Sequence, residues 1–257
     1  MYILGIRLDN LNLEEALNKI REFLHDGHQH YIVLPYADFL VQAQKDAGFK
    51  RILNESDLSL SDGVGPVLAS RIITASERLC GRACPQRQQA GLLGGRVMGV
   101  DLIWALFAKF GAEHSIFLFG AKDGVAQEMA RNIFQKAPEA KIVGMINGYV
   151  SDEKAIDEIN DRKPEILLVA LGMPKQEKWI YDNLKKMPSV KLAIGVGGAF
   201  DFISGRVRRA PNFIQQIGME WLWRLLSQPN QWRKTWRSVV IFSIMIFREL
   251  ISKRKKI

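Results

Sequence analysis

Short apolar runs that alternate with helix-length amphipathic stretches constrain this chain most strongly. In the second half, helical periodicity over Asp152–Asp161, over Lys175–Leu184 and before Ala137-Pro138 separates strand-like runs at Ile116–Gly120, Lys141–Met145, Ile166–Gly172 and Leu192–Gly198. Strands spaced by 10–15-residue helical segments are typical of right-handed βαβ units. The sequence therefore predicts an α/β fold, a Rossmann-like and mostly parallel sheet with helices on both faces.

The first half follows the same pattern less regularly. Strands are expected at Tyr2–Leu8, Tyr31–Pro35 and Asp57–Ser61, and helices at Asn12–Leu24, Phe39–Leu53, Val64–Ile73 and Val100–Phe110. Between the last two helices, Thr74–Gly95 contains five glycines or prolines, two cysteines and a Gln/Arg cluster, which predict an irregular loop.

An acid follows one of these strands directly. The run Leu58–Ser61 ends on Asp62, and Gly63 and Gly65 allow a sharp turn into the next helix. Ligands of open α/β sheets bind at the carboxyl ends of the strands, so Asp62 is the first candidate for catalysis. The alternative is that Asp62 only caps the helix that follows, and the octapeptide Leu58–Gly65 alone favours capping.

Glycine-rich turns follow three further strands, at Phe119–Gly124, Ala170–Glu177 and Gly195–Asp201. None matches a Walker loop or a G-x-G-x-x-G fingerprint, and a tight strand-to-helix turn needs glycine even without a ligand. Together, with Gln176 and Asp201 available to hydrogen-bond a base or sugar, they predict a cleft for a nucleotide or nucleotide sugar.

The net charge of +9 lies entirely in the last fifth of the chain. Residues 208–257 contain eleven Lys/Arg against two acids, Glu220 and Glu249, and four of the six tryptophans. A boundary is therefore expected near Arg208–Asn212, between a catalytic domain over residues 1–207 and a C-terminal appendage over residues 208–257. Val239–Phe247 is too short an apolar run to span a bilayer and is typical of a helix that lies in the membrane interface.

Nucleic-acid binding and oligomerisation are the two alternatives for this basic and aromatic tail. Nucleic-acid binding is disfavoured, because Val240–Phe247 is more apolar than a surface that follows phosphates. A homo-oligomer interface stays open as the second alternative. On the membrane interpretation, the terminal Lys253–Lys256 cluster faces anionic lipid.

The remaining composition predicts a cytoplasmic protein without a metal. Cys80 and Cys84 form neither a disulfide framework nor, with any second Cys or His pair, a four-ligand metal site. No secretory signal is visible at the N-terminus, and no apolar run reaches the roughly 18 residues of a membrane-spanning helix.

Six motifs in order along the chain resemble the WecG/TagA/CpsF family of bacterial glycosyltransferases. They are Leu58–Gly65 (LSLSDGVG), Arg96–Asp101 (RVMGVD), Gly172–Trp179 (GMPKQEKW), Gly195–Phe202 (GVGGAFDF), Arg208–Pro211 (RRAP) and Glu220–Leu225 (EWLWRL). The resemblance implies metal-independent, inverting transfer from a UDP-sugar donor to a polyprenyl-diphosphate-linked sugar acceptor, peripherally on the cytoplasmic membrane face. In the best-known branch the donor is UDP-N-acetylmannosamine and the acceptor is undecaprenyl-diphosphate-N-acetylglucosamine.

The resemblance also assigns roles to residues. Asp62 matches the proposed general base, Arg96 an arginine near the diphosphate, and Gln176 a donor-binding position, while Asp201 either orients the donor or caps its loop. No cofactor is implied. Four tail arginines are expected to reach the lipid diphosphate, namely Arg209, Arg224, Arg233 and Arg237.

Two departures from the family pattern leave the sugar open. Many members have a Thr and an Asn in the segment that reads Leu34–Asp38 here, where Tyr36 supplies a different hydroxyl. Thr74–Gly95 is also longer than expected between the motifs. Another UDP-hexose or UDP-uronic acid donor is therefore the rival reaction. The non-enzymatic alternative is a membrane-attached nucleotide-binding scaffold, in which Asp62 is only a helix cap.

Overall fold

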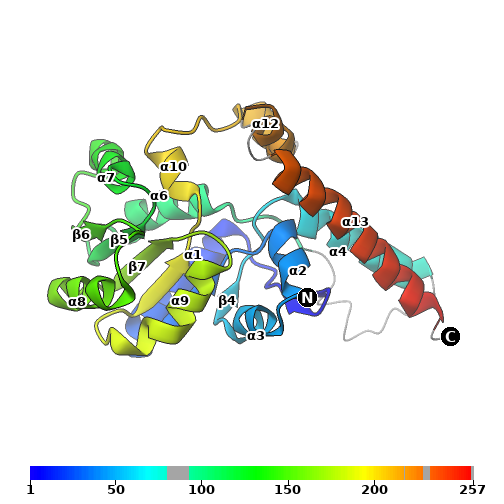
Figure 1. Cartoon of the computed structure of the whole chain (residues 1–257), viewed down its shortest axis with the longest axis horizontal. Coiled ribbons are helices and arrows are strands. Elements are labelled where there is room, and N and C mark those ends of the chain that lie inside the picture. Colours follow the sequence, from blue (N-terminus) through cyan, green and yellow to red (C-terminus); the bar gives the residue numbers. More distant parts are fainter. Residues whose placement is uncertain (80–92, 217, 228–231, 256–257) are drawn as a thin grey trace.

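Six parallel strands form the central sheet of the computed structural model, which describes residues 1–79, 93–216, 218–227 and 232–255 (Figure 1). The strand order is β4-β3-β8-β7-β5-β6, and every neighbouring pair is parallel. All six carboxyl ends therefore meet at one edge, as predicted. The strands are β3 (His30–Val33), β4 (Leu58–Ser59), β5 (Ile116–Gly120), β6 (Ile142–Ile146), β7 (Ile166–Ala170) and β8 (Leu192–Gly195).

Helices cover both faces of the sheet, which confirms the predicted α/β class. One hydrophobic cluster joins the sheet to α1 (Leu13–His25), α6 (Gly99–Phe110), α7 (Val125–Lys136) and α10 (Ala199–Ile203). The other joins it to α2 (Ala37–Ala43), α3 (Ala47–Glu55), α8 (Asp152–Arg162) and α9 (Lys175–Asn183). A short 3-10 turn, η1 (Leu184–Lys186), follows α9.

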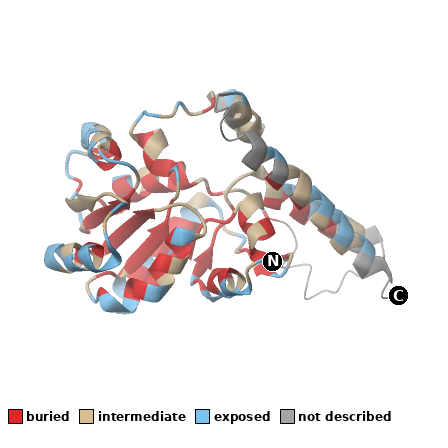
Figure 2. Cartoon of the chain, in the orientation of Figure 1, coloured by how far each residue is buried: buried red, intermediate tan, exposed pale blue. Residues whose placement is uncertain are grey.

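Strand side chains alternate between the two clusters, because successive residues of a strand point to opposite faces. In β7, Leu168 lies in the first cluster, whereas Leu167 and Val169 lie in the second. Figure 2 shows the strands as an almost continuous buried layer between half-exposed helices. This burial on both faces explains why the strands read as continuous apolar runs.

Two predicted elements are each divided in the structure. The expected strand Tyr2–Leu8 is an antiparallel pair, β1 (Tyr2–Ile3) and β2 (Ile6–Arg7), because Leu4 and Gly5 turn the chain with φ of 51° and 74°. The expected helix Phe39–Leu53 is two helices, α2 and α3. Asp46 begins the second, since its carboxylate accepts a hydrogen bond from the backbone N–H of Phe49 at 2.9 Å.

The loop predicted over Thr74–Gly95 was placed too early. Helix α4 (Val64–Leu79) continues six residues beyond the predicted end at Ile73, and Ile73 is buried on it. The strong turn formers Gly81 and Pro85 come only after that end. Cys80 and Cys84 lie outside the described residues, so the loop beyond α4 stays a prediction.

The C-terminal segment contains α11 (Asn212–Gln216), α12 (Glu220–Ser227) and α13 (Trp232–Lys255). Helix α13 lies along α2 and α4, and its Phe242 and Ile246 are buried in the second cluster (Figures 1 and 2). The packing is close at Gly65, where an added Cβ would lie 3.6 Å from the Phe242 ring. The boundary at residue 208 stays a prediction.

None of the helices in the described ranges combines the length and the apolar character that crossing a bilayer requires.

Gly120 provides a test of the strand packing at the sheet's carboxyl edge. Its φ of +112° disfavours any side chain, and an added Cβ would lie 2.5 Å from the carbonyl oxygen of Ala170 on β7. We expect Gly120→Ala to lower the free energy of unfolding by about 2 kcal/mol or more, measured by urea denaturation.

Gly198→Ala is the matched control, because Gly198 has φ of −73° and no atom lies within 4 Å of its added Cβ. Its free energy of unfolding should stay within about 0.5 kcal/mol of wild type. Equal losses in the two variants would contradict the close packing of β5 against β7.

Candidate active site

Backbone hydrogen bonds on both sides hold Asp62 at the carboxyl edge of the sheet. Its N–H donates to the carbonyl oxygen of Pro35 at 3.0 Å, which continues the pairing of β4 with β3. On the other side, the N–H of Val97 donates to the carbonyl oxygen of Ser61 at 2.9 Å. Asp62 therefore lies between the segments that follow β3 and precede α6, as the strand-end position predicts.

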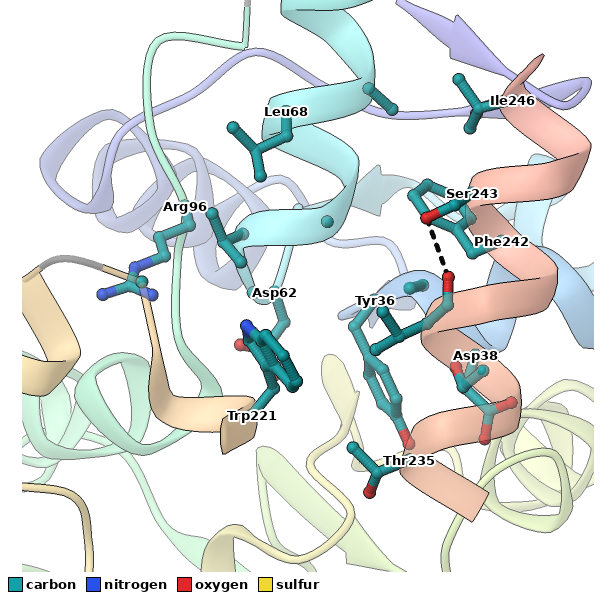
Figure 3. Close-up of a pocket in the computed structure, with 18 of the residues that line it drawn as sticks. Tyr36, Asp38, Asp62, Leu68, Arg96, Trp221, Thr235, Phe242, Ser243 and Ile246 are labelled. Atoms are coloured by element: carbon teal, nitrogen blue, oxygen red, sulfur yellow. Dashed lines mark hydrogen bonds between the residues drawn. The ribbon is translucent and has the colours of Figure 1, made fainter. Parts of the chain in front are cut away.

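A cavity of about 520 Å³ opens at Asp62 (Figure 3). Its walls come from the first turn of α2, from α4 and from the C-terminal helices α12 and α13, which are distant in sequence. Around Asp62 the lining includes Tyr36, Asp38, Arg96, Trp221 and Thr235 (Figure 3), and Glu220 also lines the cavity.

Tyr36 stands at the N-terminal end of α2 and faces this cavity together with Asp62 (Figure 3). Its ring meets that of Phe39 edge to face, with centroids 5.0 Å apart. Gly63 has φ of +89°, and an added Cβ would lie 3.7 Å from the Tyr36 Cβ. The left-handed turn at Gly63 therefore brings the segment after Asp62 close to Tyr36.

Arg96 lines the same cavity, so the structure brings it together with Asp62, as expected. Its guanidinium donates a hydrogen bond to the backbone carbonyl of Gln215 on α11. Arg96 thus connects the segment before α6 with the C-terminal helices.

Arg209 interacts electrostatically with Asp62 but forms its hydrogen bonds with Asp101. Its guanidinium donates two hydrogen bonds to the Asp101 carboxylate, at 2.5 and 3.0 Å. Burial opposes the charge of Arg209, but Asp101 outweighs this effect and raises its pKa, with smaller contributions from Glu220 and Asp62. In this structure, therefore, Arg209 is bound to helix α6.

The other tail arginines can be placed only by element. Arg224 belongs to α12, and Arg233 and Arg237 belong to the first turns of α13. Their side chains lie outside the described residues, so their approach to a diphosphate stays a prediction.

Gln176 is 1% exposed and does not line the Asp62 cavity. Its side-chain oxygen accepts hydrogen bonds from the backbone N–H groups of Gly172, at 3.1 Å, and Gly197, at 2.9 Å. It thereby joins the loops that follow β7 and β8. The role of Gln176 in donor binding stays a prediction, because the contacts seen are with the chain itself.

Glu177 is a buried acid that sequence reasoning missed. One carboxylate oxygen accepts a hydrogen bond from the Gln176 side-chain amide at 2.6 Å, and the other has no hydrogen-bond partner among the residues that the structure describes. Burial raises the pKa of Glu177 from its ordinary value of 4.5 to about 7. The only signal in the sequence is its place beside Gln176 in the GMPKQEKW motif.

Asp201 lies on α10, near the turn between β5 and α7 rather than in the Asp62 cavity. Burial raises its pKa, and the positive charges of Lys122 and Arg206 partly oppose the rise. The predicted site residues therefore form two groups along one sheet edge. Tyr36, Asp62 and Arg96 share the cavity, while Gln176 and Asp201 belong to the glycine-rich turns.

Tyr36, Asp62 and Arg96, which share the cavity, include the kinds of side chain that a proton-transfer site needs. A carboxylate with a largely apolar wall can accept a proton from a bound hydroxyl, and a guanidinium at the same end can neutralise a phosphate. Glu220 and Trp221, which the EWLWRL motif contains, add a third acid, after Asp62 and Asp38, and an aromatic surface to the cavity lining.

Comparison with known proteins points to one family. The model of the "Glycosyl transferase WecG/TagA/CpsF family" matches residues 1–256. The chain is 31% identical over 214 residues to an N-acetylglucosaminyldiphosphoundecaprenol N-acetyl-beta-D-mannosaminyltransferase of Bacillus spizizenii, covering 82% of this chain and 77% of the relative. A protein of the same name from Bacillus subtilis is 32% identical over 216 residues, with coverages of 83% and 77%.

Glu177 predicts an unusual pH dependence of stability. Between about pH 4.5 and pH 7 the unfolded chain has released the proton that folded Glu177 still holds, so stability falls as the pH rises. Glu177→Gln mimics the protonated acid. We expect this variant to be more stable than wild type at pH 8, by up to about 3 kcal/mol in urea denaturation.

The control is Glu139→Gln, which removes an exposed acid from the loop after α7. Its stability should follow wild type between pH 4.5 and pH 8. A Glu177→Gln variant that also follows wild type across this range would show that Glu177 is ionised in the folded protein.

Proposed function

The chain belongs to the WecG/TagA/CpsF family of glycosyltransferases, and from this premise we propose that it transfers N-acetylmannosamine from a UDP-sugar to polyprenyl-diphosphate-linked N-acetylglucosamine. The matching relatives are named for a diphosphoundecaprenol acceptor and an N-acetylmannosaminyl group. The observation that carries the proposal is the position of Asp62, at a strand's carboxyl end in a cavity that it shares with Arg96.

Asp62 acts in this proposal as the general base. A hydroxyl of the acceptor sugar attacks the anomeric carbon of the donor, and its proton passes to the Asp62 carboxylate. The bond between that carbon and the β-phosphate oxygen breaks, and its electron pair leaves with UDP. Attack from the face opposite the leaving group inverts the anomeric centre.

Arginine side chains supply the positive charge for the diphosphate groups, so the reaction needs no metal ion in this proposal. The support for Arg96 in this role is that it lines the same cavity as Asp62. The negative charge of Asp62 contributes to the raised pKa of Arg209, so the two side chains interact electrostatically. The bidentate contact with Asp101 fixes the plane of the Arg209 guanidinium. Arg224 of α12 and Arg233 and Arg237 of α13 are further candidates for this role by their place in the chain.

The glycine-rich turns after β8, β7 and β5, which follow β4 and β3 along the same edge, bind the donor nucleotide. Gln176 holds the turns after β7 and β8 in register, and Asp201 offers a carboxylate beside the turn after β5. The proposed reaction uses the residues of one chain, and a homo-oligomer interface in the tail stays a prediction.

A different UDP-hexose or UDP-uronic acid remains the second candidate for the donor. It is favoured by one observation, the presence of Tyr36 in the cavity where many family members have smaller polar groups nearby. A panel of UDP-sugars, each offered with the same acceptor, decides between the two donors.

The protein works on the inner face of the cell membrane, where its lipid acceptor lies. The support is the basic C-terminal segment, with Trp236, Ile244 and Phe247 exposed on α13.

The central prediction concerns Asp62→Asn. We expect it to lower UDP release in the presence of EDTA by about 100-fold or more, because the amide cannot accept the acceptor's proton. The substrates are UDP-N-acetylmannosamine and a short-chain diphospho-N-acetylglucosamine lipid, and urea denaturation verifies folding.

Asp157→Asn is the control, since Asp157 is exposed on α8, and it should match wild type. Equal turnover by wild type and Asp62→Asn would reject Asp62 as the base. An inactive wild type with every donor of the panel would favour a nucleotide-binding scaffold.

Membrane attachment is tested by changing Lys253, Arg254, Lys255 and Lys256 to glutamine together. Each basic residue near an anionic surface contributes about 1 kcal/mol, so cosedimentation with anionic liposomes should fall by tenfold or more. Zwitterionic liposomes, which lack that surface charge, should show no difference between the two proteins. Unchanged binding to anionic liposomes would refute an electrostatic contribution of this cluster.

A further inference from the structure

The Asp62 cavity continues into an apolar groove that the proposed proton transfer does not use. It runs away from Asp62 between α4 and α13, and we call it the α4/α13 groove. Helix α4 contributes Leu68, Ala69 and Ile72, and α13 contributes Val239, Phe242, Ile246, Phe247 and Leu250.

Each helix turns one continuous face to the groove, because its lining residues recur at intervals of three or four. On α13 that face changes in character along its length. Thr235 lies near Tyr36 (Figure 3), and Ser238 follows it on the same face. From Val239 to Leu250 the lining residues are apolar except Ser243, whose hydroxyl donates a hydrogen bond to the carbonyl oxygen of Val239 at 3.0 Å. The thirteen residues from Ser238 to Leu250, separated by twelve rises of 1.5 Å, span about 18 Å of helix.

The floor of the groove is packed, whereas its sides are open. Phe242 and Ile246 are 6% and 5% exposed, but Leu68, Ile72 and Phe247 are 46%, 51% and 64% exposed. Large apolar side chains on both sides of a concave surface are the usual mark of a binding groove for an apolar ligand.

We infer that the α4/α13 groove binds the polyisoprenyl chain of the acceptor next to its diphosphate, an inference that rests on the proposed function. Such an acceptor has a charged head joined to a long hydrocarbon chain. The cavity has the same order, with Asp62 and Arg96 at one end and apolar walls beyond them. A head bound at Asp62 directs its chain along the groove.

The concave shape favours a single chain over the other possible occupants. A bilayer surface or a second copy of the protein would contact projecting side chains, such as Ile244 and Trp236 on α13, which do not line the groove. Contact of the groove walls with a bilayer or a second copy is therefore an alternative outcome of the test.

Binding is tested first without any reaction. A polyisoprenyl diphosphate that carries a photoreactive diazirine on its chain, but no sugar, is irradiated with the full-length protein in detergent micelles. The labelled peptides should come from α4 and from the Val239–Leu250 part of α13, and unlabelled polyisoprenyl diphosphate should compete. Labelling confined to other elements would overturn the inference even if transfer is active.

Transfer is tested with Leu68→Gln/Ile72→Gln, a double variant of two exposed positions that should still fold. In micelles, its kcat/KM for a long-chain acceptor should fall about tenfold or more, since a polar wall disfavours an apolar chain. Its kcat/KM for an acceptor with only a methyl group on the diphosphate should match wild type. Phe134→Gln, an exposed apolar position on α7 outside the groove, should match wild type with both acceptors.

The transfer and labelling experiments have further outcomes that decide the inference. Equal losses with both acceptors, or no loss with either, would overturn the inference. So would a defect confined to vesicle binding, or a change only in oligomeric state. Labelling of the groove by the diphosphate probe, with no transfer by wild type, would support the chain site while rejecting the proposed reaction.

Discussion

The parallel pairing of β3 with β4 is the constraint on which the candidate site depends. The backbone bond from Asp62 to Pro35 extends that pairing beyond the strands, so the acid and the first turn of α2 face the same space. A carboxylate on a free loop would be displaced by each movement of the loop. Here the central sheet, buried on both faces, positions it.

The C-terminal segment forms part of the wall of the Asp62 cavity. Helix α13 buries Phe242 and Ile246 against α2 and α4, and in doing so forms one wall of the Asp62 cavity. The basic segment is thus also part of the fold that surrounds Asp62. This one packing contact places an apolar helix face beside Asp62, the proposed base.

The sequence predicted the sheet and the position of Asp62 well, because strands buried on both faces and a strand-end acid are local signals. It failed where local signals are weak. The break at Gln44–Asp46 interrupts a continuous helical pattern, and α4 continues past the buried Ile73 to Leu79. It also missed Glu177 and the packing of α13, since burial and long-range contacts depend on tertiary structure. The inward orientation of Gln176 could not be read from its motif.

The central claim, that Asp62 receives the acceptor's proton, is tested most directly by a crystal structure with UDP and the acceptor head group bound together. The account predicts a carboxylate oxygen of Asp62 within about 3 Å of an acceptor hydroxyl, with Arg96 beside a diphosphate. An acceptor whose hydroxyls all lie beyond hydrogen-bonding reach of Asp62, or a head group bound beside Asp201 instead, would contradict it.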